Sequence, residues 1–516
     1  MASFTRAISS FFALLCLLLL AIVTEARINP NKLGFVTTKG AHFVLDGSPF
    51  LFNGFNSYWL MHVAAEPSER YKVSEVFKEA SAASLSVCRT WAFSDGGDTA
   101  LQISHGVYDE RVFQGLDFVI SEARKYGIRL ILSFVNNYKD FGGRDQYAQW
   151  ARNAGILNVN SEDDFYTHPV LKDYYKNHVQ KIVTRVNSMT GIAYKDDNTI
   201  MAWELMNEPR CNADYSGKTI NGWVQEMASF VKSLDQKHLL EIGMEGFYGD
   251  SMPEKKEFNP GYQVGTDFIS SHLVKEIDFA TIHAYTDQWL SGQSDDAQAA
   301  FMQSWMTSHW QDSTTILKKP LVLAEFGKSS KDPGYNQNAR DTYISFVYRN
   351  VYNFAKASRG TMGGSLIWQL VAQGMDNFDD GYSIILAQNP STAGLISGQS
   401  HAMTTLANLV NSHLELSDIP VQSLVPEPLR ATASAEDYLL NLPKFDQELS
   451  KQRQEAVDED RIFNPPLDYE SYADIILLHL KMLIFMKVLR SMEKALLNCG
   501  DTTRNIHSRN SLDRTT

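Results

Sequence analysis

The stretch WELMNEPR, residues 203–210, contains two glutamates, Glu204 and Glu208, four positions apart. It continues the apolar run IMAW (200–203), and Pro209 interrupts it, which predicts a buried strand that ends near Glu208. A buried carboxylate is costly unless it is paired or takes part in chemistry. The segment therefore raises the question of which glutamate is structural and which is reactive.

A third glutamate, Glu325, lies in the similar apolar stretch LVLAEFG, residues 321–327. Two convergent carboxyl groups suit glycoside hydrolysis, in which one protonates the leaving oxygen and the other acts as base or nucleophile. We expect Glu208 and Glu325 to form this pair. Glu204 lies two strand steps deeper than Glu208, so we expect it to be structural and paired with an inward-facing cation.

Arg89, His283 and Tyr285 are the candidate donors that hold Glu325 ionised. The carboxyl group that receives fewer such hydrogen bonds keeps its proton and can act as the acid, while the other acts as base or nucleophile. His283 and Tyr285 are one strand period apart and face the same way. Trp91 and Trp368 are candidate platforms for sugar rings.

These side chains need a scaffold that brings distant segments together. Short apolar runs alternate with stretches whose apolar residues recur every three or four positions, the pattern of strands alternating with helices. Strands this apolar are typical of parallel sheets covered on both faces, and eight of them predict an α/β protein with a (β/α)8 TIM barrel. The alternative is a doubly wound open sheet, but no G-x-G-x-x-G follows the first strand. The predicted strands are a hairpin at 43–52 leading into the first barrel strand, then 85–92, 128–136, 200–207, 239–245, 279–285, 320–326 and 364–370; the predicted helices include 72–83, 110–126, 171–188, 222–234 and 338–357.

In such a barrel the reacting groups come from the carboxyl ends of the strands. Taking only those ends selects a polar and aromatic set. The set comprises Asn53, Asn56, Arg89, Trp91, Asn136, Asn137, Asn207, Glu208, Glu245, His283, Tyr285, Glu325 and Trp368.

Composition narrows the class of protein. With 44% hydrophobic and 11% aromatic residues, the chain of 516 residues is expected to be globular. A formal charge of −13 argues against nucleic acid as a partner.

The cysteines and an acidic loop give no metal site. Beyond Cys16, the widely spaced Cys88, Cys211 and Cys499 form neither a disulfide framework nor a zinc-ligand pattern. The loop GMDNFDDGY (374–382), with Asp376, Asp379 and Asp380, resembles a calcium loop, but its spacing does not fit an EF-hand. We expect no metal and no other cofactor.

The N-terminal residues 1–26 have the pattern of a signal peptide. Arg6 supplies the basic region, 11–23 form a short apolar block, and Ala26 ends a stretch with small residues. We therefore expect a secreted, extracellular protein that does not insert stably into a membrane.

The remaining chain divides at about residue 412. Residues 27–412 form the predicted catalytic domain, and 413–516 form an extension that is Pro-rich and charged at its start. Within the extension, 473–497 has the pattern of an amphipathic helix, and 502–516 is predicted to be disordered.

Several stretches resemble the plant endo-β-1,4-mannanases of glycoside hydrolase family 5. Together they extend over residues 30–412, and as a set they are specific. The stretches are CRTWAFSDGG (88–97), MAWELMNEPRC (201–211), IDFATIHAYTDQWL (277–290), KPLVLAEFGKSSKDPGYN (319–336) and GGSLIWQL with GMDNFDDGYSIIL (363–386).

The resemblance implies a retaining mechanism with Glu208 as acid/base and Glu325 as nucleophile. It also implies a cis peptide after Trp368, a β-1,4-mannan in cell walls as substrate, and a monomer. The residues that it places around the −1 sugar are Arg89, Asn207, His283, Tyr285 and Trp368, with Trp91 alongside.

Two other functions are compatible with the same residues. A β-1,4-glucanase would have the same catalytic pair and would differ in its sugar contacts. A non-catalytic polysaccharide-binding protein would have lost one of the two glutamates, and both are present. The extension 413–516 has no counterpart in the family pattern.

Overall fold

The computed structural model describes residues 34–414. All of them belong to one compact unit of the chain. The predicted signal peptide, Cys499 and nearly all of the predicted extension 413–516 lie outside the described residues.

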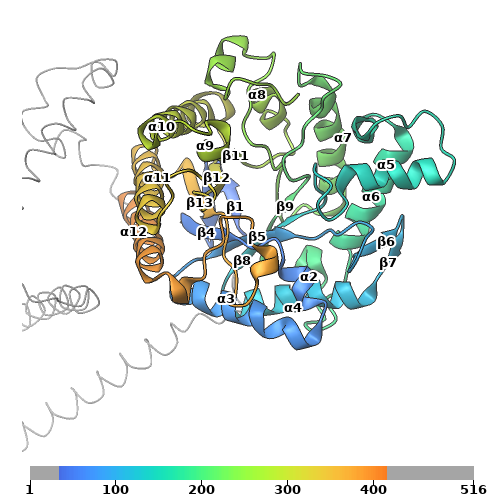
Figure 1. The fold of residues 1–516 in the computed structure, drawn as a ribbon, viewed down its shortest axis with the longest axis horizontal. Helices are drawn as coiled ribbons and strands as arrows, with labels where there is room; N and C mark the ends of the chain where they lie inside the picture. The colour runs from blue at the N-terminus through green and yellow to red at the C-terminus, as the bar shows by residue number, and fades with distance from the viewer. Residues whose placement is uncertain (1–33, 415–516) are drawn as a thin grey trace, which may run out of the picture. The chain divides into compact units, whose positions relative to one another are not determined.

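Eight parallel strands form the central sheet, in the order β10-β9-β8-β5-β4-β13-β12-β11. Main-chain hydrogen bonds from His283 N to Glu245 O (2.9 Å) and from Asp278 N to Leu240 O (2.8 Å) join the segments of the first and last strands, so the sheet closes. Figure 1 shows the strands at the centre, with the helices around them. The predicted (β/α)8 barrel is confirmed. The barrel strands are β4 (Phe52–Asn56), β5 (Val87–Trp91), β8 (Arg129–Ser133), β9 (Ile200–Glu204), β10 (Leu239–Glu241), β11 (Ala280–Ala284), β12 (Leu321–Phe326) and β13 (Met362–Ile367).

The helices connect successive strands on the outside of the barrel, and their ends carry expected signals. In α4 (Glu110–Tyr126), for example, the Asp109 side chain accepts a hydrogen bond from Arg111 N, and Gly127 ends the helix at φ 70°. The others are α2 (Leu60–Ala64), α3 (Arg70–Ala82), α5 (Gly143–Asn153), α6 (Pro169–Val183), α7 (Lys218–Leu234), α8 (Phe268–His272), α9 (Thr286–Trp289), α10 (Asp295–Asp312), α11 (Gln337–Ala357) and α12 (Pro390–Leu414), with short 3₁₀ turns at Pro67–Glu69, Glu162–Tyr166, Tyr194–Asp196, Pro253–Phe258, Asp376–Phe378 and Leu386–Gln388 and a π turn at Ser313–Leu317.

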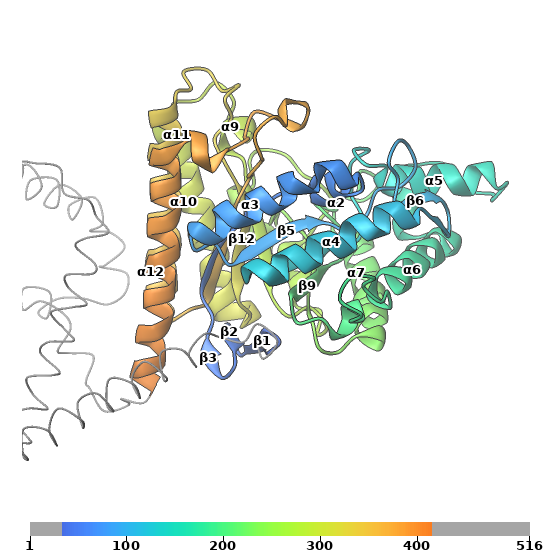
Figure 2. The same ribbon diagram turned by 90° about the horizontal axis from the view of Figure 1, so that it is seen from below.

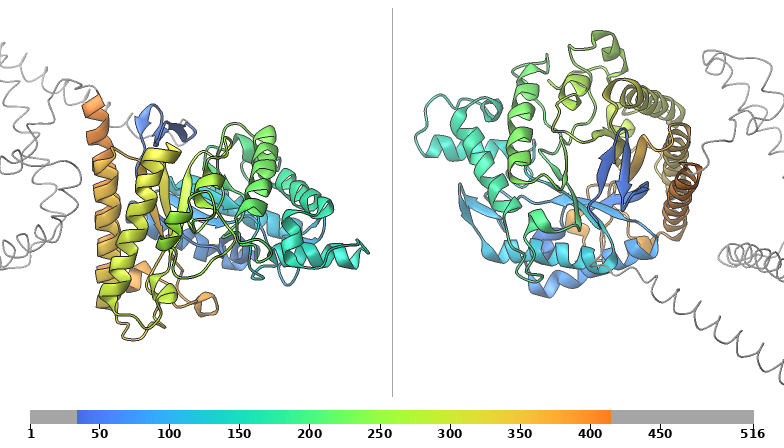
Figure 3. Two further views of the ribbon diagram at one scale, coloured as in Figure 1. Left: turned by 90° about the horizontal axis from the view of Figure 1, so that it is seen from above. Right: turned by 180° about the vertical axis from the view of Figure 1, so that it is seen from behind.

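A small antiparallel sheet covers the amino-terminal end of the barrel. Its strands are β1 (Thr37–Lys39), β2 (His42–Leu45) and β3 (Ser48–Pro49), and Figures 2 and 3 show it at the end from which β4 starts. Phe43 is fully buried and contacts the rings of Phe52 and Phe279 at centroid distances of 5.9 and 5.2 Å. The predicted hairpin is therefore present, and it fills this end of the barrel with apolar side chains, leaving the polar groups at the opposite end.

The two remaining strands, β6 (Gln102–Ser104) and β7 (Val107–Tyr108), pair with each other outside the barrel. Cys88 and Cys211 are buried free thiols. Among residues 34–414, none of the helices has the length and apolar character needed to cross a bilayer.

Candidate active site

Arg89 and Glu204 form a fully buried ion pair inside the barrel. Arg89 is the third residue of β5, and its Nε and Nη2 donate to the two carboxylate oxygens of Glu204, the last residue of β9, at 2.5 and 2.7 Å. Burial opposes ionisation of Glu204, but the charge and hydrogen bonds of Arg89 outweigh it and lower the pKa of Glu204. The prediction that Glu204 pairs with an inward cation is confirmed.

Glu325 shares the same arginine. Arg89 Nη1 donates to Glu325 Oε1 at 2.5 Å, and the Tyr285 hydroxyl donates to Oε2 at 2.6 Å. The register of β11 against β12 shifts at Ile282 and His283, which places His283 directly opposite Glu325. Glu325 is thus held at both oxygens, on the carboxyl side of β12.

Glu208 lies beyond the regular strand β9, in a bend of the main chain. Its φ is 49°, in the left-handed region that non-glycine residues rarely adopt, and its N–H donates to Gly243 O at 2.8 Å. Such local strain is typical of functional positions, where the surrounding structure holds it in place. The Tyr138 hydroxyl donates to Glu208 Oε2 at 2.9 Å.

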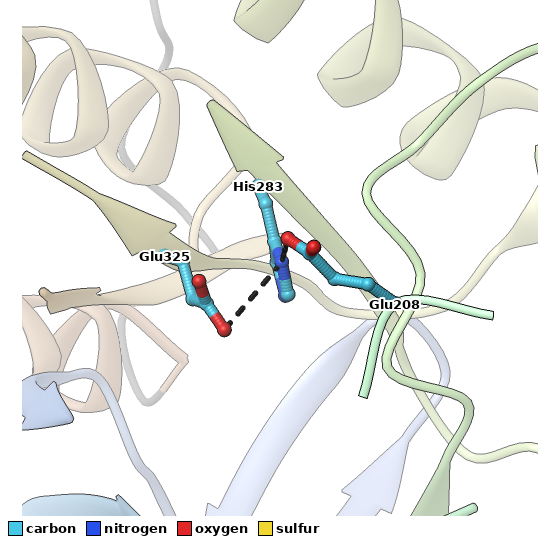
Figure 4. A group of neighbouring side chains, drawn as sticks. All are labelled: Glu208, His283 and Glu325. Atoms are coloured by element: carbon cyan, nitrogen blue, oxygen red, sulfur yellow. Dashed lines mark hydrogen bonds and ion pairs between the residues drawn. The ribbon is translucent and has the colours of Figure 1, made fainter. Parts of the chain in front are cut away.

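His283 differs from its expected role. We expected it to donate to Glu325, but His283 Nδ1 is hydrogen-bonded to Glu208 Oε1 at 2.6 Å, while Glu325 Oε1 is 3.6 Å away. Figure 4 shows the imidazole between the two carboxyl groups. His283 is thus the register partner of Glu325 but binds Glu208 through its ring, whereas Tyr285, beyond the end of β11, donates to Glu325.

The two carboxyl groups share a buried environment and influence each other. Burial raises the pKa of Glu208, and the charge of Arg210 only partly opposes this effect. Burial also raises the pKa of Glu325, where the nearby His283 and Arg89 oppose it and the charge of Glu208 reinforces it. Burial lowers the pKa of His283, which favours the neutral imidazole. A pair in this environment readily holds one proton and one negative charge between its members.

Aromatic rings border the pair on one side. The Arg89 guanidinium lies 4.9 Å from the centre of the Trp91 ring, and the centroids of Trp91 and Trp368 are 6.2 Å apart. Trp368 Nε1 donates to Asp380 Oδ2 at 2.6 Å, and the peptide between Trp368 and Gln369 is cis, as expected. Asp380 of the acidic loop therefore orients an aromatic ring at the site.

The predicted amide residues fall into two groups. Asn207 accepts from Arg89 Nη2 at 2.7 Å and donates to Asn136 Oδ1 at 3.0 Å, so both lie at the site, and Asn56 also accepts from Arg89. Asn53 does not lie there: its amide donates to Ile396 O and Ser400 Oγ of α12. Three positions separate Asn53 from Asn56, so alternation along β4 sends them to opposite faces.

The structure adds residues that the sequence did not single out. Tyr138 contacts Glu208, as described, and Arg210 Nη2 and Nε bind both oxygens of Glu245 at 2.6 and 2.9 Å. Glu241 lies below the site beside Glu204. Tyr138 directly follows the predicted strand-end residues Asn136 and Asn137, and extending that rule by one position would have found it.

One carboxyl oxygen of Glu208, one of Glu325 and a ring nitrogen of His283 lie within 4.8 Å of one another. Two buried carboxyl groups therefore meet at the carboxyl ends of the strands, and Arg89 links Glu325 to Glu204 and lies against Trp91. Such a set can protonate a leaving oxygen and supply a carboxylate to the atom that it leaves.

Residues 33–376 match the family model "GH family 5 beta-mannosidase-like". The chain belongs to glycoside hydrolase family 5. It is therefore a member of a family of glycosidases, as its resemblance implied.

Two plant relatives from glycoside hydrolase family 5 extend this match. The chain is 76% identical over 415 residues to mannan endo-1,4-beta-mannosidase 5 of Solanum lycopersicum, which covers 80% of this chain and 100% of the tomato protein. It is 52% identical over 404 residues to mannan endo-1,4-beta-mannosidase 1 of Oryza sativa subsp. japonica, covering 77% and 93%.

Solved structures agree with the barrel. An endo-1,4-beta-D-mannanase from Thermotoga petrophila is similar with a TM-score of 0.60 at 31% identity, covering 68% of this chain and 99% of that one. The endo-1,4-beta-mannanase from Rhizomucor miehei has a TM-score of 0.61 at 29% identity, covering 72% and 100%.

Proposed function

We propose that this chain is a secreted, endo-acting hydrolase that cleaves internal β-1,4-mannosidic bonds with retention of configuration. The observation that carries the proposal is a pair of buried carboxyl groups, of which one oxygen each lies within 4.8 Å of the other, at the mouth of a family 5 barrel. Retaining glycosidases hold their carboxyl groups about 5–5.5 Å apart, whereas inverting enzymes need about 6.5–9.5 Å to admit a water.

In the first step Glu325 attacks the anomeric carbon. Its two oxygens receive hydrogen bonds from Arg89 and Tyr285, and the full positive charge of Arg89 favours placing the negative charge of the pair there. Glu208 carries the proton, because its own partners are the Tyr138 hydroxyl and a neutral His283. It transfers that proton to the leaving oxygen as the bond to the sugar breaks.

In the second step the roles at Glu208 reverse. The departing chain leaves room for water, and Glu208, now ionised, takes a proton from it while the water oxygen attacks the glycosyl-Glu325 ester. The ester opens, Glu325 regains its charge, and Glu208 regains its proton. Arg89 stays in place throughout, since Glu204 holds it through two further bonds.

The substrate assignment rests on the relatives. The tomato protein at 76% identity and the rice protein at 52% both carry the name mannan endo-1,4-beta-mannosidase. Trp91 and Trp368 lie close to each other, and Trp91 lies against Arg89, which binds Glu325; both are candidate platforms for a pyranose ring.

Secretion is a proposal from the sequence. The basic, apolar and small-residue order of residues 1–26 is that of a cleaved signal peptide. Expression of the full chain in a secretory host, with N-terminal sequencing of protein from the medium, tests it. A start after about residue 26 supports the proposal, and retention of the protein inside cells contradicts it.

Purified protein offered galactomannan, glucomannan and cellulose tests the activity. We expect reducing ends to appear rapidly on both mannans, with a sharp early fall in viscosity, and little action on cellulose. Proton NMR of the first products should show the β anomer before mutarotation. Equal kcat/KM on cellulose would demote the enzyme to a broad β-glycanase, and an initial α anomer would exclude retention.

A further inference from the structure

A second acid faces Glu204 beneath the reactive pair. Glu204 in β9 and Glu241 in β10 are register partners in adjacent parallel strands, and both are 0% exposed. Partners in adjacent strands point to the same side of the sheet, here the barrel interior. Two ionised carboxylates at this depth would repel each other with no water to screen them.

The donors around Glu241 reach only one of its two oxygens. Its Oε2 accepts from Gly243 N at 2.5 Å and from Thr281 Oγ1 at 3.2 Å. Its Oε1 has no hydrogen-bond partner among residues 34–414, and its register partner in the adjacent strand is the Glu204 carboxyl group. Ionised carboxylates only accept hydrogen bonds, so Glu241 and Glu204 can bond to each other only if one of the two groups is protonated.

The surroundings decide which group holds the proton. Glu204 receives two hydrogen bonds from Arg89, which favour its ionised form. Glu241 receives none from a cation among the described residues, and burial together with the charge of Glu204 raises the pKa of Glu241 well above its usual value. Glu241 Oε1, which has no partner among the described residues, is therefore the atom that can carry a proton toward Glu204.

We propose that Glu241 is a permanently neutral carboxylic acid that donates to Glu204 and thereby positions Arg89 and the nucleophile Glu325. It is a positioning residue, since it acts on the reaction through Glu204 and Arg89. The catalytic part of this inference rests on the proposed function of Glu325; the protonation of Glu241 does not.

Charge balance explains the effect. Arg89 is shared by the Glu204 and Glu325 carboxylates. A hydrogen bond from Glu241 offsets part of the negative charge on Glu204, so that more of the guanidinium charge acts on Glu325 and lowers the cost of ionising it. An ionised Glu241 would instead place a third negative charge near the same arginine.

Several other charged or titratable groups lie close to Glu241, Arg89 and Glu325. A substitution at residue 241 leaves these other groups unchanged. Around Glu325 these are His283, Glu208 and Tyr285. Around Glu241 they are Glu204 and Arg89. Changes at residue 241 therefore reach Glu325 through Glu204 and Arg89.

The test compares Glu241→Gln with Glu241→Ala. The glutamine amide reproduces the neutral acid, because its NH2 can donate to Glu204 while its oxygen accepts from Gly243 and Thr281. We expect Glu241→Gln to keep kcat/KM within about threefold of wild type, as an isosteric donor should, and to leave the acidic limb of the pH profile in place. Glu241→Ala should lower kcat about tenfold with little change in KM, as loss of exact positioning does, and should move the acidic limb to higher pH by about half a unit or more.

An infrared measurement tests the proton without any catalysis. The difference spectrum of wild type minus Glu241→Gln at neutral pH should contain the C=O stretch of a buried, protonated carboxylic acid. The matched control, wild type minus Glu208→Gln, should show a separate band that titrates.

Several outcomes would overturn the proposal. A missing acid band for residue 241, or an acidic limb that moves to lower pH in Glu241→Gln, would mean that Glu241 is ionised in the wild type. A wild-type pH profile in Glu241→Ala, or a Glu241→Gln protein that fails to fold, would remove its positioning role. Absence of mannan cleavage by the wild type would overturn the proposed function alone, because the band would still report the proton.

Discussion

Glu204 and Glu208 belong to one short segment, yet their environments are opposite. Glu204 ends a regular strand, is fully buried, and is bound at both oxygens by a guanidinium. Glu208 lies in a left-handed bend beyond that strand and is bound by a hydroxyl and an imidazole. Consequently the pKa of Glu204 falls as Arg89 outweighs burial, whereas burial raises the pKa of Glu208.

The difference shows that burial by itself does not make a carboxyl group reactive. Both groups are removed from water, and the charge of the partner decides whether the carboxylate or the acid is favoured. A full cation beside Glu204 creates a fixed ion pair. Neutral partners beside Glu208 leave a proton that a substrate can take. The predictions below test this contrast, from the largest expected effect to the smallest.

The largest effect should come from the reactive pair. Glu325→Ala should abolish cleavage of mannan, and Glu208→Ala should lower kcat on mannan about 10²–10⁴-fold, the usual contribution of a general acid/base. On aryl mannosides with good leaving groups Glu208→Ala should lose far less in the first step, because no proton is then needed.

Azide distinguishes the two roles. With Glu325→Ala, azide should replace the missing nucleophile and yield the α-glycosyl azide; with Glu208→Ala it should attack the glycosyl-enzyme and yield the β-glycosyl azide. NMR of the products settles the configuration. The opposite pairing of variants and anomers would reverse the assignment of the two glutamates.

Replacement of the structural glutamate, Glu204, should instead lower the stability of the fold. Glu204→Ala leaves Arg89 without its main partner, and breaking a buried pair typically lowers the free energy of unfolding by about 3–5 kcal/mol. Glu204→Gln keeps the shape and one acceptor and should lose less. Urea unfolding at constant pH measures both, and Glu208→Gln serves as the control with little loss. Equal stability of Glu204→Ala and wild type would contradict a structural role for the ion pair.

The contrast also explains what the sequence could predict. Strand alternation and the rule of carboxyl ends located Glu208, Glu325, Arg89 and Trp368, because these depend on local pattern and a known closure of the sheet. The partner of His283 could not be predicted, since it depends on where the bend beyond β9 places the Glu208 side chain. The predicted strands were also longer than the observed ones, because burial continues past the residues that pair regularly with neighbouring strands.

Residues 205–207 and 242–245 are buried like strands but leave the regular ladder after Glu204 and Glu241. Gly243, at φ 90°, permits the main chain to turn there, and a Cβ at this position would lie 2.0 Å from Met206 O. Apolar periodicity reports burial and not main-chain pairing, so the bend that carries Glu208 was not visible in it.

Asp95 can be compared with Glu204 and Glu208, because it is a buried carboxyl group to which no cation of residues 34–414 is bound. Gln102 Nε2 donates to its Oδ1 at 3.1 Å, its Oδ2 has no hydrogen-bond partner among the described residues, and burial raises the pKa of Asp95 to about 8. The folded protein thus binds the proton more tightly than the unfolded chain. The stabilisation is complete below pH ~4, the unfolded pKa, and is lost as pH rises from there to about 8.

Asp95→Asn should remove this dependence. Each unit of pKa difference is worth about 1.4 kcal/mol, so between pH 5 and 8 the wild type should lose up to a few kcal/mol more of its free energy of unfolding than the variant. Urea unfolding at intervals across that pH range measures how the free energy of unfolding of each protein changes with pH. Glu204→Gln is the control, because the pKa of Glu204 is lowered in the folded protein and not raised. Parallel slopes for wild type and Asp95→Asn would show that Asp95 is ionised in the folded state.

The smallest effect should come from removal of residues 418–516, which follow the proposed site in the sequence. The proposed site residues lie between Arg89 and Trp368, and the tomato relative aligns along its whole length with 415 residues of this chain.

A variant ending at Ser417 retains α12, whose Ile396 and Met403 are fully buried and whose Ile396 O accepts from Asn53. We expect its kcat/KM on galactomannan to stay within about twofold of wild type and its Tm within about 2 °C, since the core of residues 34–414 is kept whole. A matched variant that ends at Asn389 removes α12 and should fail to fold, because it exposes that part of the core. A large loss of activity or stability in the Ser417 variant would show that residues 418–516 contribute to the barrel.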